Sequence, residues 1–568
     1  MFKRTYRVSQ AAVATRDSDR PIGPNASAAN VGAACANTGR TAPRTTGAHV
    51  SIALSSVLWL GASGWAQAQA TAQPAQPAPA QPAPAQPSGS EAAQAAGPAT
   101  PAAEPANAPV QPADASAADG EANIPLVKHK LANGLRMIMN PDHTVPTVAV
   151  AVYYDVGSRN EVLTRTGFAH LFEHMMFQGS ENVGKGEHFQ LVMNRGGSAN
   201  GTTSTDRTNY YETMPSNELA LALWLEADRM RSLEITQANF ENQRQTVMEE
   251  RRQSYDNRPY MQSMLRINEL AYGDYFPYAH STIGKMADLQ NAPLSAVQEF
   301  FDTYYAPNNA ILSIAGDFDP QQAIALAERY FGPIPARATQ RFAAPEAAPQ
   351  TAERMETLYD SLAELPAFHI AYHIPPDRSP DHYPLELLAI ILGDGESSRL
   401  YQELVKGKQI LQDVSVATDG RRGPDLFSVW AVCASGQAPS KARELIYKHF
   451  ADVAKRGVTS KELEKAKNRV RSAFVFGLES NMARAQRLAE YELYFGDAAL
   501  LATEADRYLN ITADDIKRVA KTYFMTENRT VLDVLPGAAP APAEGAAASA
   551  QSASPTTDST KTGSQEAQ

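Results

Sequence analysis

Two histidines four residues apart are the feature of this 568-residue sequence with the clearest chemistry. His170 and His174 would lie on one face of a helix with their Cβ atoms about 5–6 Å apart, which suits two nitrogen ligands of one zinc ion. Glu173 lies between them, where its carboxylate can accept a proton from a water activated by the metal. The order H-x-x-E-H inverts the commoner H-E-x-x-H motif. These residues predict a metal centre with its own general base.

A zinc site that works on a substrate needs a third protein ligand and one open position. Residues 236–255 form a predicted helix that Thr236 can cap. This helix carries Glu249 and Glu250, which are about 100° apart around the helix axis. Either carboxylate could be the third ligand, and both could instead be surface charges on an acidic-basic helix.

The two ends of the chain differ from its middle in composition. Residues 1–70 form a predicted signal region, because an apolar run at 50–62 follows two arginines and precedes an A-x-A site. The run is too short for a stable membrane span, although a retained N-terminal anchor stays open. Residues 71–122 are almost wholly Ala, Pro and Gln, which predicts an extended linker. Residues 537–568 predict a disordered tail. We therefore expect a periplasmic or secreted protein.

The cysteine content indicates a cellular compartment, and the net charge excludes one class of binding protein. Cys35 would leave with the signal, so Cys433 remains alone and no intramolecular disulfide can form. An exported protein without disulfides fits a bacterial periplasm. The formal net charge of −11 argues against a nucleic-acid-binding protein.

The folded body is predicted to be an internal duplication of one α+β domain. The two copies are expected at 124–340 and 357–536, joined by a linker at 341–356. Predicted strands at 147–154 and 367–374 begin the two copies. A helix-to-strand motif recurs at a constant offset of 219 residues. Its matching residues are Thr303, Tyr304 and Asn309 in the first copy and Thr522, Tyr523 and Asn528 in the second.

The second copy lacks the metal-binding residues. Its matching helix, predicted at 384–393, contains no histidine, and Ala389 and Gly393 fall where His170 and His174 lie in the first copy. One copy is therefore expected to carry the metal and the other to shape the cavity.

Three segments together carry a family resemblance. Residues 167–179, 196–211 and 249–255 resemble the pitrilysin-type, inverted-zincin metallopeptidases of family M16, and the resemblance covers the whole folded body. The family places its third ligand at the distance from the second histidine that Glu250 has from His174, 76 residues. The resemblance therefore selects Glu250 over Glu249.

The resemblance implies an α+β fold of two duplicated M16-type domains, each an antiparallel-rich sheet packed with helices, which together form a half-chamber. It implies one Zn²⁺ per chain, held by His170, His174 and Glu250, with Glu173 as the catalytic base. It also implies that a peptide substrate adds to an exposed edge strand. The residues of that strand are Ser198, Ala199, Asn200, Gly201 and Thr202, with Asn200 orienting the substrate. An ordinary hairpin is the alternative, because Gly-Gly and Asn-Gly are turn signals.

The sequence departs from the family pattern in two places. Some members carry a second glutamate seven residues before the third ligand, where this chain has Gln243. Val405 and Gln412 occupy positions at which the family carries an Arg and a Tyr that hold the substrate and the developing oxyanion. The chain thus resembles the catalytic subunit of two-chain bacterial M16B peptidases, whose metal-less partner supplies that pair. His280, in another family-like segment, is interpreted as structural.

Taken with the resemblance, these features predict an exported zinc endopeptidase acting on peptides or unfolded polypeptides, with a homologous metal-less subunit as partner. No nucleic-acid partner and no stable membrane span are expected. The alternative is a non-catalytic M16-fold assembly subunit. A processing peptidase with one dedicated substrate is equally compatible with the sequence.

Overall fold

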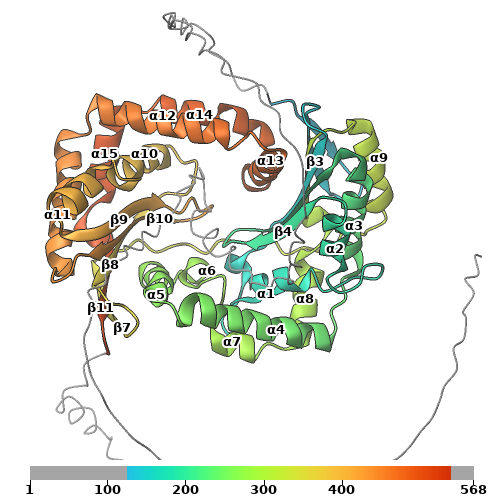
Figure 1. Cartoon of the computed structure of the whole chain (residues 1–568), viewed down its shortest axis with the longest axis horizontal. Helices are drawn as coiled ribbons and strands as arrows, with labels where there is room; N and C mark the ends of the chain where they lie inside the picture. The colour runs from blue at the N-terminus through green and yellow to red at the C-terminus, as the bar shows by residue number, and fades with distance from the viewer. Residues whose placement is uncertain (1–123, 539–568) are drawn as a thin grey trace, which may run out of the picture. The chain divides into compact units, whose positions relative to one another are not determined.

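A computed structural model describes residues 124–538, which belong to one unit (Figure 1). The predicted signal region, the 71–122 linker, Cys35 and all but the first two residues of the predicted tail lie outside the described residues. Among the helices of the described part, none combines the length and the apolar content needed to cross a bilayer.

The first half of the described chain forms a six-stranded sheet. Strand β3 lies near its centre and pairs antiparallel with both neighbours, while β2 and β6 run parallel. The strands, in spatial order, are β1 (Val127–Lys130), β2 (Arg136–Pro141), β6 (Ala310–Gly316), β3 (Thr147–Tyr154), β5 (Thr208–Pro215) and β4 (Ser198–Thr203).

The second half forms a five-stranded sheet with the same pairing. Parallel β7 and β11 correspond to β2 and β6, and an antiparallel run follows in each sheet. The strands, in spatial order, are β7 (Arg354–Asp360), β11 (Arg529–Pro536), β8 (Ala367–Ile374), β10 (Asp425–Cys433) and β9 (Leu411–Thr418). The predicted duplication is therefore confirmed at the level of the fold. Strand β7 begins within the predicted linker 341–356.

The recurring helix-to-strand motif has one physical role in both halves. The side-chain amide of Asn309 donates to the carbonyl of Tyr304 over 2.9 Å, and that of Asn528 donates to the carbonyl of Tyr523 over the same distance. Each asparagine satisfies a carbonyl at a helix end, which has no partner within the helix. The repeat is therefore a helix C-terminal cap that leads into a central strand.

Helices cover both sheets. Those of the first half are α1 (Phe168–Met175), α2 (Glu187–Met193), α3 (Leu219–Ser232), α4 (Gln237–Arg251), α5 (Met261–Tyr272), α6 (Phe276–Ala279), α7 (Met286–Gln290), α8 (Leu294–Tyr304) and α9 (Pro320–Tyr330). Those of the second half are α10 (His382–Gly393), α11 (Pro439–Arg456), α12 (Ser460–Phe476), α13 (Asn481–Phe495), α14 (Glu504–Leu509) and α15 (Ala513–Tyr523).

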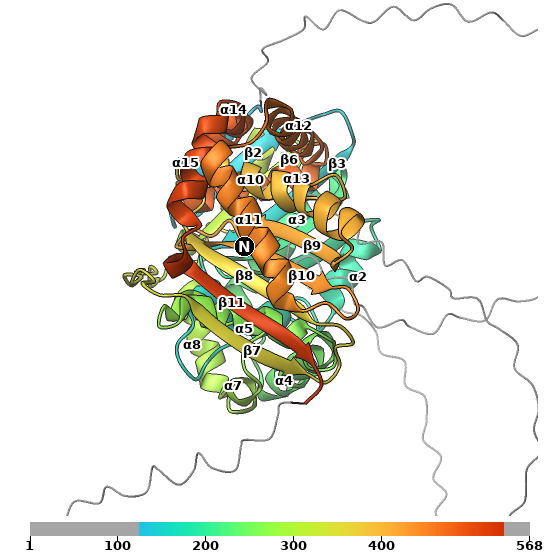
Figure 2. The ribbon, with the colours of Figure 1, turned by 90° about the vertical axis from the view of Figure 1, so that its left-hand side faces the viewer.

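One helix of each half packs on the sheet of the other half. Helix α13 packs on β3 and β6 of the first sheet (Figure 1), and it fully buries Ala485, Leu488 and Ala489. Helix α5 packs on β11, β7 and β8 of the second sheet (Figure 2). This apolar burial joins the halves into one core, since a buried leucine alone contributes about 1.5–3 kcal/mol.

The helix that carries Glu250 agrees with the sequence pattern in its start and in its length. Thr236 caps α4 by accepting a hydrogen bond from the backbone N–H of Asn239. The α-helix ends at Arg251 and continues as a π-helical turn over Arg252–Asp256. The end of the predicted helix thus has wider winding, which is common near functional sites.

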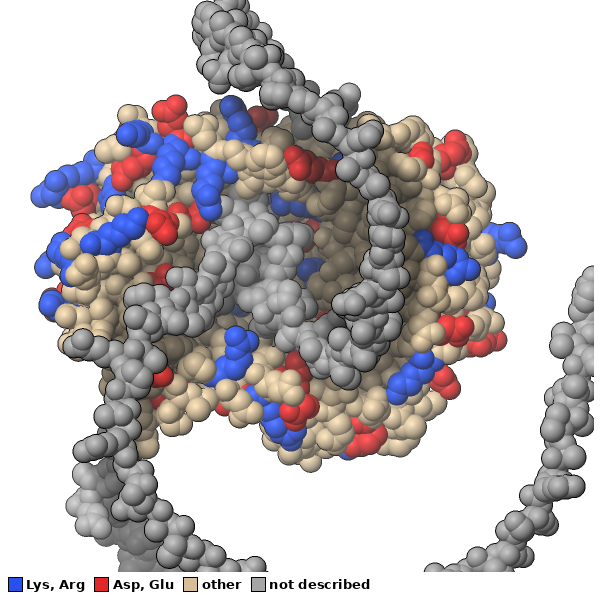
Figure 3. All heavy atoms as spheres, viewed as in Figure 1, with Lys and Arg blue, Asp and Glu red and all other residues tan. Residues whose placement is uncertain are grey.

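Charged side chains of both signs are interspersed on the face drawn in Figure 3. On the described residues of this face, positive and negative side chains lie near one another, so their electrostatic potentials partly cancel.

Candidate metal centre

Helix α1 and the end of α4 bring three donor side chains to one point. The Nε2 atoms of His170 and His174 lie 3.3 Å apart. Nε2 of His174 lies 3.3 Å from Oε2 of Glu250, and Nε2 of His170 lies 3.7 Å from its Oε1. Donors bound tetrahedrally to zinc at 2.0–2.1 Å would be about 3.3–3.4 Å apart. The donor set fits a zinc ion in chemistry and in spacing.

Glu249 points away from this centre. Its carboxylate accepts hydrogen bonds from Arg252 at 3.1 Å and Gln253 at 2.9 Å, and its side chain is half exposed. Because successive residues of a helix are about 100° apart, only Glu250 can face the histidines. The structure therefore places Glu250, the glutamate that the family spacing selects, beside the two histidines.

Burial and charge set the protonation of the three donors. Burial lowers the pKa of His170, and the neighbouring His174 lowers it further. Burial also opposes charge on His174, but a hydrogen bond to Glu250 and the nearby carboxylates raise its pKa above the ordinary value. The two imidazoles hold the pKa of Glu250 below its usual range despite its burial. The carboxylate is thus kept ionised, as a metal ligand must be.

His170 and His174 differ in the hydrogen-bond partners that support their rings. Gln243 is buried and its side chain hydrogen-bonds His174. Nδ1 of His170 is buried and makes no hydrogen bond to the described residues. A ring nitrogen opposite a metal ligand usually donates to a carboxylate or a carbonyl. An amide therefore supports one histidine at the position where some family members carry a glutamate.

The candidate base is held by the neighbouring strand. The hydroxyl of Thr203 donates to Oε2 of Glu173 over 2.6 Å. A Cβ added at Gly201 would lie 3.2 Å from Cγ of Glu173 and 3.0 Å from the Tyr210 ring. Sequence analysis missed Thr203, although alternation along a strand places residues 201 and 203 on one face. That period is the signal that could have found it.

Strand β4 is an edge strand. Among the described strands it pairs only with β5, and it covers the predicted segment Ser198–Thr202 together with Thr203. The side chain of Asn200 accepts a hydrogen bond from the backbone N–H of Gly201 at 2.8 Å. The role of Asn200 in orienting a substrate stays a prediction.

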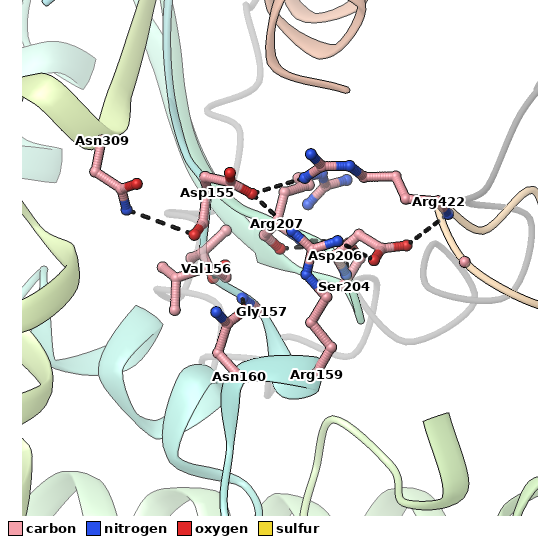
Figure 4. A network of polar contacts seen from close by, with 12 residues as sticks. Asp155, Val156, Gly157, Arg159, Asn160, Ser204, Asp206, Arg207, Asn309 and Arg422 are labelled. Atoms are coloured by element: carbon pink, nitrogen blue, oxygen red, sulfur yellow. Dashed lines mark hydrogen bonds and ion pairs between the residues drawn. The ribbon is translucent and has the colours of Figure 1, made fainter. Parts of the chain in front are cut away.

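The turn between β4 and β5 is fixed by a polar network that includes the second half (Figure 4). Oδ1 of Asp206 accepts from Arg159 over 2.8 Å, and its Oδ2 accepts from the backbone N–H of Arg422 over 3.1 Å. The guanidinium of Arg422 donates to Asp155 over 2.6 Å. The loop between β9 and β10 thereby holds the hairpin that carries the edge strand.

A second group of donor side chains lies outside this centre. His188, Glu212 and Glu226 are buried with their donor atoms within 4.8 Å of one another. However, Arg229 donates to both carboxylate oxygens of Glu226 and already supplies a positive charge. Burial raises the pKa of Glu212 to about 8 and lowers that of His188 to about 3. A neutral carboxyl–imidazole hydrogen bond, 3.2 Å long, explains this pair without a metal.

Val405 and Gln412 of the second half stand at the two positions where the resemblance places an arginine and a tyrosine. Val405 packs against the apolar core, and Gln412 lies exposed on β9. Helix α10 begins at His382, two residues before the predicted start, so the prediction of a helix without histidine was wrong. His382 faces Asp425 over 3.0 Å. In the described residues it belongs to no group of donor atoms close enough for a metal.

Two sheets of one pattern, with a convergent donor set on two helices of the first half, α1 and α4, define a metallopeptidase-like duplicated fold. Residues 136–274 match the family described as "Insulinase (Peptidase family M16)", and residues 292–470 match the "Peptidase M16 inactive domain". The chain belongs to peptidase family M16, as the resemblance implied.

Curated relatives and solved structures agree with this assignment. The chain is 31% identical over 420 residues to zinc protease PqqE of Helicobacter pylori, which covers 72% of this chain and 94% of the relative. It is 23% identical over 409 residues to the mitochondrial-processing peptidase subunit beta of Lentinula edodes, over 69% of this chain and 86% of the relative. The crystal structure of a protease from Helicobacter pylori superposes with a TM-score of 0.69 at 30% identity, covering 72% of this chain and all of that one.

Proposed function

We propose that this chain is an exported zinc-dependent endopeptidase that hydrolyses peptides or unfolded polypeptides. The observation that carries the proposal is the convergence of His170, His174 and Glu250 beside a carboxylate, Glu173, that is hydrogen-bonded to an edge strand. One zinc ion per chain is proposed. The zinc proteases among the relatives support the metal and the reaction class.

The two oxygens of Glu173 have different tasks in this proposal. Zinc, when bound by the three donors, would supply a Lewis acid that polarises the scissile carbonyl and acidifies a water molecule. Thr203 occupies Oε2 of Glu173, so Oε1 is the oxygen free to accept the water proton. Glu173 then passes this proton to the leaving amine. Thr203 keeps the carboxylate in one orientation throughout.

The substrate would lie along β4. An extended peptide can add to a free strand edge through main-chain hydrogen bonds, and these bonds demand no particular side chains. The residues proposed to bind it are Ser198, Ala199, Asn200, Gly201 and Thr202. The network around Asp206 supports the proposal, because it holds this edge in place before a substrate arrives.

A homologous metal-less subunit would complete the site. Val405 and Gln412 can supply neither a guanidinium nor a phenol for an oxyanion. A partner with an Arg/Tyr pair would provide these donors. Export to the periplasm or beyond is proposed from the apolar run at 50–62 and the A-x-A site that follows it.

One observation favours a second candidate, a non-catalytic M16-fold assembly subunit. Residues 292–470 match the inactive-domain family, and Val405 and Gln412 stand where the family resemblance places the Arg/Tyr pair. Against it, a scaffold has no need of a carboxylate held beside three convergent donors, because such polar groups cost stability when partly buried.

Metal content and peptide hydrolysis measured on the purified full chain would decide between them. We expect about one zinc per chain and cleavage of an unstructured fluorogenic peptide in the presence of the partner. A chelator should abolish cleavage, and added zinc should restore it. A chain that binds zinc but cleaves no peptide with any metal-less homologue would support the assembly role.

A further inference from the structure

The helix that carries the metal-binding histidines is capped by a residue outside it. Gly167 occupies the N-cap position of α1 in a left-handed conformation, with φ 89°, and offers no side chain. The Glu161 carboxylate replaces that cap. Its Oε2 accepts from the backbone N–H of Gly167 and its Oε1 from that of Ala169, each over 2.8 Å. A buried negative charge thus binds the positive end of the helix dipole.

His280 contacts this carboxylate and must itself be charged. Its Nε2 lies 3.1 Å from Oε2 of Glu161 and 3.0 Å from the carbonyl of Ser158, and its Nδ1 lies 2.8 Å from the carbonyl of Phe276. A neutral imidazole has one N–H and one acceptor nitrogen. Carbonyl oxygens only accept, so both ring nitrogens must donate. The geometry therefore requires an imidazolium, paired with a carboxylate that is almost wholly buried.

Other charged groups lie beside His280 around a cavity of about 150 Å³. Two positive groups, Arg266 of α5 and Arg251 of α4, face carboxylates of their own. The charged residues that line the cavity with His280 are Arg251, Arg266, Glu269 and Lys285. Glu161 is thus the carboxylate that hydrogen-bonds His280 directly.

The segment 280–285 also reaches the helix that carries Glu250. The guanidinium of Arg251, the last residue of α4, donates to the carbonyl of Gly284. A Cβ added at Gly284 would lie 2.3 Å from the carbonyl oxygen of Thr166 and 2.4 Å from Cα of Gly167. The backbone N–H of Lys285 donates to the Thr166 hydroxyl over 2.9 Å. One short segment therefore contacts both the start of α1 and the end of α4.

We infer that the segment 280–285 is a clamp that sets the separation of α1 and α4, and that Glu161 and His280 are its positioning residues. The pair acts on the start of α1, where the first histidine follows the capped N–H of Ala169 directly. Arg251 acts on α4 in the turn that contains Glu250. The clamp thereby holds two nitrogen donors and one carboxylate at the spacing of a zinc site. This inference rests on the proposed function only for the identity of the metal.

A charged pair suits this task better than an apolar contact. Its hydrogen bonds fix direction as well as distance, and losing one partner leaves the other charge buried and unpaired. The pair is therefore a specific connection between two segments 119 residues apart in the chain.

Zinc affinity tests the clamp on the full chain. His280→Gln and Glu161→Gln should each weaken zinc binding about 10–100-fold in competition with a chromophoric chelator, the range found for residues behind metal ligands. His382→Gln is the matched control, because His382 is equally buried against a carboxylate but lies in the second half. Its zinc affinity should stay within about 2-fold of the wild type.

Two outcomes would overturn the inference. One is unchanged zinc affinity in both clamp variants that still fold, as judged by thermal unfolding of the zinc-free chains. The other is an equal loss of affinity in the control. A wild-type chain that binds no zinc would instead contradict the proposed function.

A measurement on the unmutated, zinc-free chain keeps the test independent of variant folding. Nitrogen-15 NMR of the histidine rings should show both nitrogens of His280 protonated at pH 7.5, where a free imidazole of pKa about 6.5 has lost its proton. A neutral His280 at that pH would contradict the charged pair.

Discussion

Helices α1 and α10 follow equivalent strands in the two halves, yet they bury different shares of their surfaces. In α1 the residues His170, Glu173 and His174 form a polar stripe and remain partly exposed beside an apolar face. In α10 every residue except Glu386 is buried. A polar stripe stabilises a helix less than an apolar one does in this position, because desolvated polar groups need partners. The first half has kept a stripe that the packing alone does not require.

What the halves share is as informative as what separates them. Both keep the strand pairing and the asparagine cap, and both contain a buried histidine facing a carboxylate, His280 with Glu161 and His382 with Asp425. The fold therefore depends on caps, pairing and core. The proposed chemistry depends on a few side chains that only the first half carries in the described residues.

The largest difference between the halves should appear when the candidate base or a candidate ligand is removed from α1 alone. Glu173→Gln should lower turnover about 10²–10⁴-fold while zinc stays bound, because Glu173 is proposed as a base and not as a ligand. His170→Ala should lose both zinc and activity. Glu386→Gln, at the one position of α10 that is not buried, should leave turnover unchanged. Steady-state kinetics and metal analysis would check these results, and zinc loss in Glu173→Gln would refute the division of roles.

The second half can be tested by supplying what it lacks. A homologous chain without H-x-x-E-H but with the Arg/Tyr pair should raise the peptidase rate about 10²–10³-fold, the worth of one oxyanion donor. The measurement is the rate of peptide cleavage as this partner is titrated in. A second copy of the same chain is the control, because it lacks the same pair. A full rate from the isolated chain would show that its donors lie elsewhere.

The adjacent carboxylates Glu249 and Glu250 on α4 can be compared directly, because only Glu250 lies beside the histidines. Glu250→Gln should weaken zinc binding by about 100-fold or more, beyond the usual cost of losing a residue behind a ligand. Glu249→Gln should leave the zinc affinity unchanged, because its carboxylate is bound to Arg252 and Gln253. Chelator competition would measure both. The reverse pattern would mean that α4 is rotated from the described orientation.

The edge strands of the two sheets offer a smaller effect. Thr203→Val removes the hydroxyl that holds Glu173, and a hydrogen bond to a charged group is worth about 1.5–3 kcal/mol. We expect kcat to fall about 10–100-fold with KM and zinc content unchanged, and Thr203→Ser to restore it. Thr418→Val, at the end of the equivalent strand β9, should have no effect on kcat. A changed KM with constant kcat would assign Thr203 to substrate binding instead.

Patterns close in sequence could be predicted, and contacts between distant segments could not. Strands β3 and β8 have the predicted bounds, because runs rich in β-branched and aromatic residues are typical of strands. The candidate ligands His170 and His174 follow from helix spacing, and Glu250 follows from the distance that the family resemblance implies. The start of α10 was misplaced because Pro384 resembles a helix start, whereas the helix tolerates proline in its first turn.

The residues that position the site depend on tertiary contacts. Thr203 meets Glu173 across 30 residues and His280 meets Glu161 across 119, and no local pattern marks such pairs. The packing of α13 on the first sheet and of α5 on the second could not be predicted for the same reason. Sequence periodicity indicates that a helix has an apolar face, but it does not indicate which sheet receives that face.

The last expected effect concerns stability and not catalysis, and it uses two buried histidines whose pKa values shift in opposite directions. His382 is buried, which opposes its charge, but Asp425, Asp377 and Glu386 face it and raise its pKa to about 9. The unfolded value is about 6.5. Below pH 6.5 both states hold the proton and the charge stabilises the fold fully, by about 3 kcal/mol at most. As the pH rises from 6.5 through about 9, this contribution is lost.

Urea unfolding of the wild type and His382→Gln from pH 5 to 10 would measure this loss. The difference in unfolding free energy should be constant below pH 6.5 and shrink between pH 6.5 and 9. His369→Gln is the control, because burial lowers the pKa of His369 to about 3. There the unfolded chain gains a proton below pH 6.5 that the folded chain refuses, so the wild type loses stability as the pH falls. The two differences should therefore change on opposite sides of pH 6.5, and a His382 difference that is flat up to pH 10 would show that its carboxylates do not hold it charged.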